Sequence, residues 1–425
     1  MSRVNCGKNT LEGGAILGPA TRANGAMQQE YSCAGKPRKH KFKHRVVIDR
    51  RLCRALIRTI RACTIIAASL STRTRTMSNS LKAIFVACAL SAAGAALADE
   101  QVVNLYSARH YATDEDLYNG FTKATGIKIN RVDGDDAGII ARLKAEGQAS
   151  PADVILLVDA ARLYRGEQEG LFQPIQSKTL DSVIPANLRA QPSADGGTQW
   201  FGLSTRARVI VYNKAKVQPA DVANYESLAD PKFKGQLCIR SGSHPYNLSL
   251  FGAVVEHMGE QQAENWIKGM KANLARPPKG GDTDQVKAVA SGECSIAVTN
   301  SYYLARLMRS SKPEDTAVAS KVGVVFPNQS SWGTHLNIAG AAVARYSPNK
   351  SNAIKFVEYL ASPTAQNYFA NGNNEWPAAK GVEIDNPALK AMTSDKPFKS
   401  ETIPISAVGK NMTKVQQMLD RAAFP

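Results

Sequence analysis

The fold class is decided by residues 101–159, which read QVVNLYSARHYATDEDLYNGFTKATGIKINRVDGDDAGIIARLKAEGQASPADVILLVD. Apolar residues at 102–105 predict a buried strand, and the helical spacing of Leu117 and Phe121 before Gly126 predicts a helix. Residues 127–133 then predict a strand, residues 137–147 a helix, and residues 152–159 an apolar strand. This β-α-β-α-β order predicts a parallel sheet covered by helices, with ligand-binding loops after the strands.

Residues 200–214 are apolar without helical periodicity and therefore predict an extended segment. A second α/β unit begins within this segment, near residue 206. The pattern from about residue 206 predicts strands at 236–240 and 294–300 and helices at 248–259 and 263–274, and two further helices, at 351–371 and about 406–422, finish the chain. We therefore expect two α/β lobes joined by extended crossovers, which is the arrangement of a hinged binding protein. Lobe 1 is expected to comprise residues 99–205 and 328–377, and lobe 2 residues 206–327 and 378–425.

The basic residues are unevenly distributed along the 425-residue chain, whose formal net charge is +17. Residues 1–98 contain 17 of the 53 Lys and Arg but only three of the 36 Asp and Glu. The rest of the chain therefore has a net charge of +3. Because the basic excess is confined to the N-terminal stretch, the composition does not favour nucleic acid as a partner.

Residues 77–98, MSNSLKAIFVACALSAAGAALA, have the layout of a secretory signal peptide. Lys82 precedes an apolar run, and small residues end at the A-x-A site 96–98. We expect export to the periplasm and a mature chain that begins at Asp99. Residues 1–76 are then interpreted as a non-native upstream extension; the alternative is a genuine basic extension.

Two of the seven cysteines, Cys238 and Cys294, lie after the signal peptide. Two cysteines in an exported protein most simply pair with each other, so we expect a disulfide. The alternative is a pair of buried free thiols.

The common enzyme motifs are missing from the sequence, which contains no GxSxG, P-loop or HExxH pattern. Asp135 and Asp136 are interpreted as solvated loop acids, and His257 and His335 as structural residues. The sequence therefore does not favour an enzyme.

Tyrosines follow three of the predicted strands: Tyr111 after the first, Tyr246 after 236–240, and the pair Tyr302 and Tyr303 after 294–300. A single tyrosine in such a loop is ordinarily a half-buried ring with a hydrogen-bonded hydroxyl. Several tyrosines at the ligand-binding edge of two α/β units instead indicate a site.

Converging phenol oxygens suit a hard, highly charged cation. A free tyrosine has a pKa near about 10, and a bound cation can displace the phenol proton. Ligation by oxygen alone disfavours Zn(II) and Cu(I), and the lack of an acidic cluster disfavours Ca(II). Fe(III) fits this set of ligands best.

Five segments resemble the periplasmic ferric-iron-binding proteins of bacterial iron ABC importers. They are YSARHYATDEDLYNGFTKATGIKIN (106–130), SPADVILLVDAARLYR (150–165), WFGLSTRARVIVYNK (200–214), CIRSGSHPYN (238–247) and NSYYLARL (300–307). The resemblance spans about residue 101 to the C-terminus, and the tyrosine pair is its most specific part. It implies an α/β, two-lobed periplasmic binding protein of type II-like form with two hinge crossovers. It also implies a monomer that delivers Fe(III) to an inner-membrane ABC permease.

Residue by residue, the resemblance implicates Tyr302, Tyr303, Tyr246 and Tyr111 as metal ligands, with His110 as a further candidate. Arg206 matches a basic residue that in some members faces the metal or a synergistic anion. Members with a His-Glu pair in the first lobe would need a glutamate near His110, where this chain has Tyr111. Whether an anion such as carbonate accompanies the iron stays open. The alternative interpretation is the same fold binding a small organic or oxyanion ligand through the tyrosines.

Overall fold

The structure is a computed structural model that describes residues 101–109, 111 and 113–425. The expected signal peptide at 77–98, the extension at 1–76 and the candidate ligand His110 lie outside the described residues. The predicted β-α-β-α-β order is confirmed: β1 (Val102–Ser107), α3 (Asp114–Thr125), β2 (Lys128–Asp133), α4 (Asp136–Glu146) and β3 (Val154–Val158). β1 lies between β2 and β3 and pairs in parallel with both.

Helix α3 shows how the local sequence produces these elements. Its first turn carries acidic residues, which the positive end of the helix dipole stabilises. Leu117 and Phe121 are buried on one face. Gly126 ends the helix at a φ of 74°, and its N–H donates to the carbonyl of Thr122.

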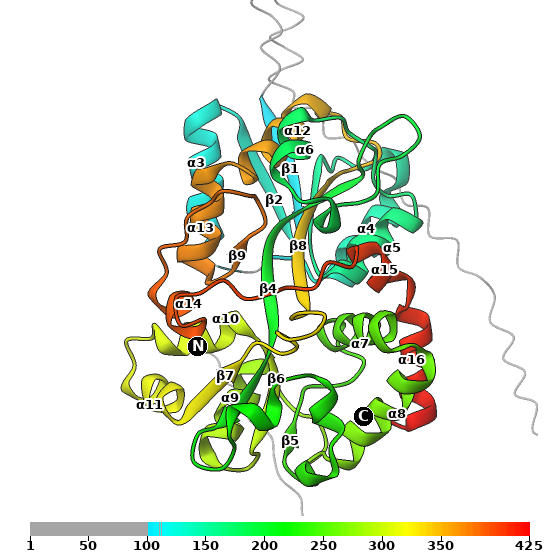
Figure 1. Cartoon of the computed structure of the whole chain (residues 1–425). Helices are drawn as coiled ribbons and strands as arrows, with labels where there is room; N and C mark the ends of the chain where they lie inside the picture. Colours follow the sequence, from blue (N-terminus) through cyan, green and yellow to red (C-terminus); the bar gives the residue numbers. More distant parts are fainter. Residues whose placement is uncertain (1–100, 110, 112) are drawn as a thin grey trace, which may run out of the picture. The chain divides into compact units, whose positions relative to one another are not determined.

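The 14-residue strand β4 (Trp200–Asn213) connects the two α/β units (Figure 1). Its first half pairs with β8 (Leu336–Val343) and β9 (Trp376–Pro377), and its second half pairs with β6 (Ile296–Asn300) and β7 (Val322–Val325). With β5 (Leu237–Cys238) beside β6, the strand order is β2-β1-β3-β8-β4-β6-β5. The partner of β4 changes from β8 to β6 between Ala207 and Arg208. The exact lobe boundaries stay a prediction.

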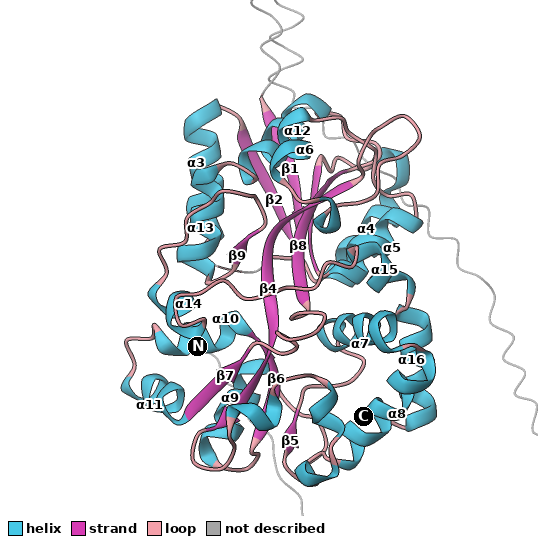
Figure 2. Ribbon diagram, viewed as in Figure 1, coloured by secondary structure: helices cyan, strands magenta, loops and turns pink. Residues whose placement is uncertain are grey.

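Helices flank the strands of both units, and Figure 2 shows α3 and α13 on one side of the first unit and α4 and α5 on the other. The remaining α-helices are α5 (Ala160–Gln168), α6 (Lys178–Val183), α7 (Pro245–Met258), α8 (Glu260–Ala272), α9 (Asp282–Ser291), α10 (Ser301–Met308), α11 (Pro313–Lys321), α12 (Lys350–Leu360), α13 (Pro363–Asn373), α14 (Pro387–Met392), α15 (Ile405–Lys410) and α16 (Met412–Ala422). Short 3-10 helices cover Gly147–Ala149, Ala186–Leu188, Pro219–Val222, Glu226–Ala229 and Pro231–Phe233.

Buried side chains form one core around the first unit and two cores on opposite faces of the second-unit strands. Side chains that alternate in direction along strand β4 contribute to both cores of the second unit. Ile210 packs into one core, while its neighbours Val209 and Val211 pack into the other. The second unit is therefore a sheet covered on both sides, as its apolar strands predict.

Three predicted elements differ from the structure. The helix expected at 351–371 is two helices, because Pro363 lacks the N–H that would continue α12 and Ser362 caps α13 by accepting from the N–H of Ala365. The C-terminal helix is likewise divided into α15 and α16, on either side of Asn411. The strand expected at 236–240 is shortened to the two residues of β5.

Cys238 and Cys294 form the expected disulfide, with Cα atoms 5.8 Å apart. Both residues are buried against the second unit's strands. In the part of the chain that the structure describes, none of the helices is long and apolar enough to span a membrane.

Candidate metal centre

Tyr302 and Tyr303 occupy the first turn of α10, directly after strand β6. Consecutive residues in a strand point to opposite faces, but the helical turn lets both rings lie side by side. Their centroids are 4.1 Å apart at an interplanar angle of 29°. Tyr302 is buried and Tyr303 is half-buried.

Tyr246 reaches the same place from the first turn of α7. Pro245 begins that helix, and the His244 side chain caps it by accepting from the N–H of Tyr246 at 3.2 Å. The Tyr246 hydroxyl lies 3.5 Å from the Tyr302 hydroxyl. The N-terminal ends of α7 and α10 thus meet at these phenols, and the helix dipoles favour negative charge there.

Tyr111 contributes from the other unit, in the loop between β1 and α3. Its ring centroid is 6.2 Å from that of Tyr302, and the two rings are nearly perpendicular. Its hydroxyl donates a hydrogen bond to Glu375 Oε1 at 3.1 Å. The four predicted tyrosines are therefore brought together, although they come from one loop and two helix N-termini in two α/β units.

Arginine side chains surround the tyrosines. The guanidinium of Arg306 lies 5.7 to 5.9 Å from the ring centroids of Tyr111, Tyr302 and Tyr303. Arg240 lies 5.1 Å from the ring of Tyr246, and Arg109 lies 4.9 Å from the ring of Tyr111. Such cations lower the electrostatic cost of forming phenolates.

Burial acts in the opposite direction and raises the pKa of the phenols. It raises the pKa of Tyr246 to about 12, despite the nearby charge of Arg206. Burial, followed by repulsion from the Tyr111 and Tyr246 phenolates, also raises the pKa of Tyr302. Burial and then the Glu375 carboxylate raise the pKa of Tyr111. These phenols are therefore protonated at neutral pH, and they ionise together only if a cation lies among them.

Arg206, predicted to face the metal or an anion, is fully buried on β4. Its Nε and Nη2 atoms donate to Glu375 Oε1 at 3.2 and 3.1 Å, and Nη1 donates to the carbonyl of Ile338 at 3.1 Å. Its guanidinium lies 5.9 Å from the ring of Tyr302. Arg206 thus lies beside the tyrosines with its donors engaged by the protein.

Glu375 is a site residue that the sequence analysis missed. It is fully buried, and burial alone would raise its pKa. The charges of Arg109 and Arg206 outweigh burial and lower the pKa of Glu375 to about 2. The only feature of the sequence that sets Glu375 apart is its place in residues 373–377, NNEWP, between two asparagines and a Trp-Pro pair.

Asp282 supplies a second buried carboxylate, beside Tyr246. It accepts from Arg208 Nη1 at 2.6 Å, from Arg240 Nη1 at 3.3 Å and from the N–H of Asn300 at 2.7 Å. This carboxylate therefore neutralises the two arginines that lie over the Tyr246 ring, and it binds the backbone of Asn300, which directly precedes α10.

The other polar candidates serve the fold. Asp135 caps α4 by accepting from the N–H of Gly138, and Asp136 accepts from the N–H of Val158. His335 and His257 both contact the buried carboxylate of Glu401. Among the described residues, His, Cys, Asp and Glu form no cluster of three that could hold a metal ion.

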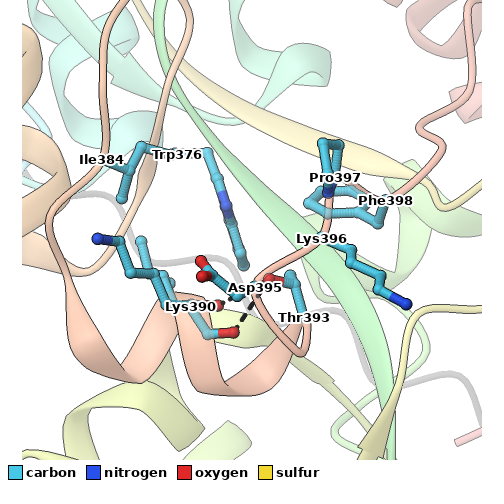
Figure 3. A pocket seen from close by; sticks show the side chains of 9 residues that line it. Trp376, Ile384, Lys390, Thr393, Asp395, Lys396, Pro397 and Phe398 are labelled. Carbon is cyan, nitrogen blue, oxygen red and sulfur yellow. Dashed lines mark hydrogen bonds between the residues drawn. The ribbon is translucent and has the colours of Figure 1, made fainter.

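A separate cavity of about 330 Å³, lined in part by Trp376, is shown in Figure 3. Its lining includes Lys390, Lys396, Asp395 and Phe398 but none of the predicted ligands. With lysines as its cationic groups and no tyrosine, it does not offer the donors that a ferric ion prefers.

Comparisons with known proteins agree with this architecture. The family described as "Bacterial extracellular solute-binding protein" matches residues 116–397, and the chain belongs to this family. More particularly, the chain is 45% identical over 326 residues to iron uptake protein A1 of Synechocystis sp., covering 77% of this chain and 88% of that protein. It is 31% identical over 307 residues to the major ferric iron-binding protein of Neisseria meningitidis, covering 71% and 87%.

Solved structures of iron-binding proteins superpose on this chain over most of its length. A Trichodesmium FutA structure in complex with iron and citrate superposes with a TM-score of 0.71 at 51% identity, covering 76% of this chain and all of that one. A ferric binding protein from Campylobacter jejuni superposes at 0.70 with 37% identity, covering 76% and 100%. The predicted two-lobed periplasmic-binding-protein fold is thereby confirmed.

Proposed function

We propose that this protein binds Fe(III) in the periplasm through Tyr111, Tyr246, Tyr302 and Tyr303 and delivers it to an inner-membrane ABC permease. The observation that carries the proposal is the convergence of these tyrosines, with the Tyr246 and Tyr302 hydroxyls 3.5 Å apart and the Tyr111 ring against Tyr302. The names of the relatives, iron uptake protein and ferric iron-binding protein, support iron as the ligand.

The charge of the site is consistent with a trivalent cation. Four phenolates would carry one negative charge more than Fe(III) neutralises, and Arg306 lies beside three of the four rings. A neutral organic ligand would leave the phenols protonated, with no need for this positive surround. The arrangement therefore favours a metal ion over a neutral organic ligand, and the relatives named for iron uptake and ferric iron binding support a metal ion over an oxyanion.

We further propose that iron binding needs no synergistic anion. The Asp282 carboxylate already places a negative charge against Nη1 of Arg208, Nη1 of Arg240 and the N–H of Asn300, so the protein itself supplies an anionic partner for these arginines. Wild-type protein loaded in carbonate-free and citrate-free buffer should develop its full iron colour. A colour that develops only after carbonate or citrate is added would contradict this part of the proposal.

The test of the function is metal analysis and a visible spectrum of protein purified from the periplasm. Iron bound to phenolate gives a ligand-to-metal charge-transfer band, whereas an organic ligand gives none. We expect one iron per chain and such a band. A protein without iron that also fails to take up a ferric chelate would overturn the proposed function.

A further inference from the structure

Helix α15 contacts both α/β units. Its first residue, Ile405, belongs to the buried core of the first unit, whereas Val415 and Leu419 of the next helix, α16, belong to a core of the second unit. Figure 1 shows α15 beside α5 of the first unit and above α7 of the second, and α15 contacts both helices. In addition to strand β4, a short segment near the C-terminus therefore joins the two units.

The chain reaches α15 from the region where the strands cross between the units. The N–H of Thr334 donates to the carbonyl of Lys399 at 2.9 Å, and the N–H of Glu401 donates to the carbonyl of Thr334 at 3.0 Å. Thr334 lies two residues before β8, which pairs with β4. A rotation of the two units about these strands would therefore move α15 relative to at least one of them.

Hydrogen bonds attach α15 to the second unit. Asn411, directly after α15, donates from Nδ2 to the carbonyl of Gly252 at 3.2 Å and to Glu256 Oε1 at 2.5 Å, both on α7. A Cβ on Gly252 would lie 3.0 Å from the carbonyl oxygen of Val408, so the two helices approach each other closely. α15 is thus fixed to the helix whose first turn carries Tyr246.

The attachment to the first unit is apolar. In the part of the chain that the structure describes, α15 packs against α5 without a hydrogen bond or an ion pair. Gly409 lies against the ring of Tyr164, where a Cβ on the glycine would come within 2.5 Å of the Tyr164 Cβ. The packing is also incomplete, because a cavity of about 470 Å³ lies between α5, α7 and the junction of α15 with α16. This side of α15 is therefore easier to separate than the hydrogen-bonded side.

We propose that α15 (Ile405–Lys410) is a latch that moves with α7 and holds the first unit against the second through Ile405 and Gly409. The ring centroids of Tyr111 and Tyr302 are 6.2 Å apart here, so the latch is engaged in the arrangement that brings the tyrosines together. Opening of the units would keep the bonds to α7 and break the apolar contacts with the first unit. The latch thus stabilises the closed arrangement whichever ligand the tyrosines bind.

The competing explanation is that α15 is an ordinary part of the buried core. A matched pair of variants separates the two explanations. Ile405→Ala and Leu419→Ala remove the same number of carbon atoms from buried positions, but from the first-unit core in one case and from a second-unit core in the other. Both variants should unfold at lower urea concentration than the wild type. Only Ile405→Ala should shift the balance between the closed and open arrangements.

The experiment measures the rate at which iron-loaded protein releases iron to excess chelator, and the radius of gyration of iron-free protein by small-angle X-ray scattering. We expect Ile405→Ala to release iron about tenfold faster than the wild type, because a larger open fraction exposes the metal more often. Leu419→Ala should keep the wild-type rate and radius. If Ile405→Ala does not fold, Gly409→Ala replaces it, since the added methyl group pushes α15 away from Tyr164.

Faster release or a larger radius in Ile405→Ala alone supports the latch. A folded Ile405→Ala with the wild-type rate and radius would overturn it, and so would equal changes in Leu419→Ala. A wild type that binds no ferric iron would overturn the proposed function, and the radii of the iron-free variants would then decide about the latch by themselves.

Discussion

The hydroxyl of Tyr246 lies 3.5 Å from the hydroxyl of Tyr302, although the two residues are 56 positions apart in the chain. Each belongs to the first turn of a helix that follows a strand of the second unit, and β5 and β6 are neighbours in the sheet. Parallel neighbours place their carboxyl ends at one edge, so the helices that follow them begin side by side. The sheet thereby brings together three of the four proposed iron ligands, Tyr246, Tyr302 and Tyr303.

Loss of a ligating oxygen should weaken iron binding strongly. Tyr302→Phe, Tyr303→Phe and Tyr246→Phe keep the ring and remove only the oxygen, so each should lower ferric-iron affinity by more than about 100-fold. Chelator competition measures this. Tyr212→Phe and Tyr164→Phe are the controls and should retain wild-type affinity and colour. If Tyr302→Phe and Tyr303→Phe both bind iron as the wild type does, the assignment of Tyr302 and Tyr303 as ligands is wrong.

Iron binding should release protons, because burial raises the pKa of Tyr246 to about 12 and raises the pKa of Tyr302 and Tyr111 as well. Protons compete with the metal below these pKa values, so the apparent affinity should rise with pH, by about tenfold per pH unit for each proton released. Titration in weakly buffered solution counts the protons. Tyr246→Phe should release one fewer than the wild type, and an unchanged count would argue against Tyr246 as a ligand.

The protein should lose stability in acid partly through Glu375. Its pKa is lowered to about 2 in the folded protein, against 4.5 as the ordinary value. The resulting stabilisation is complete above pH 4.5 and is lost as the pH falls toward 2; its size is on the order of 3 kcal/mol. Urea unfolding at pH 6 and pH 3 should therefore show a smaller acid loss for Glu375→Gln than for the wild type. The exposed control Glu383→Gln should follow the wild type, and an acid loss in Glu375→Gln equal to that of the wild type would contradict the assignment.

The disulfide between Cys238 and Cys294 should stabilise the second unit. It closes a loop of 56 residues, for which the chain-entropy model gives about 4 kcal/mol at most. The variant with both cysteines replaced by alanine should unfold at lower urea concentration while it keeps the iron band. Thiol titration of unfolded, unreduced protein should find no free thiol in the mature chain, and two free thiols would refute the pairing.

Local patterns predicted the strands and helices of the first unit, because Leu117, Phe121 and Gly126 carry the signals for α3 within a few residues. They also placed the tyrosines, since each follows a strand that ends at the ligand-binding edge. The break at Pro363 was missed although the proline is visible in the sequence, because apolar spacing continues across it. The proline nevertheless removes the backbone donor that a continuous helix needs.

Glu375 could not be found in this way. Its contact with Tyr111 spans 264 positions, and its contacts with Arg206 and Ser204 depend on β9 pairing with β4. No periodicity in the sequence indicates which distant donors a buried acid will meet. Such a residue is identified only when the sheet topology is known.

The central claim, that four tyrosines from two units hold one ferric ion, is tested most directly by anomalous X-ray scattering at the iron edge from crystals grown with iron-loaded protein. The account predicts one strong anomalous peak within coordination distance of the phenol oxygens of Tyr111, Tyr246, Tyr302 and Tyr303. A peak that contacts none of these oxygens, for example in the cavity lined in part by Trp376, would contradict it.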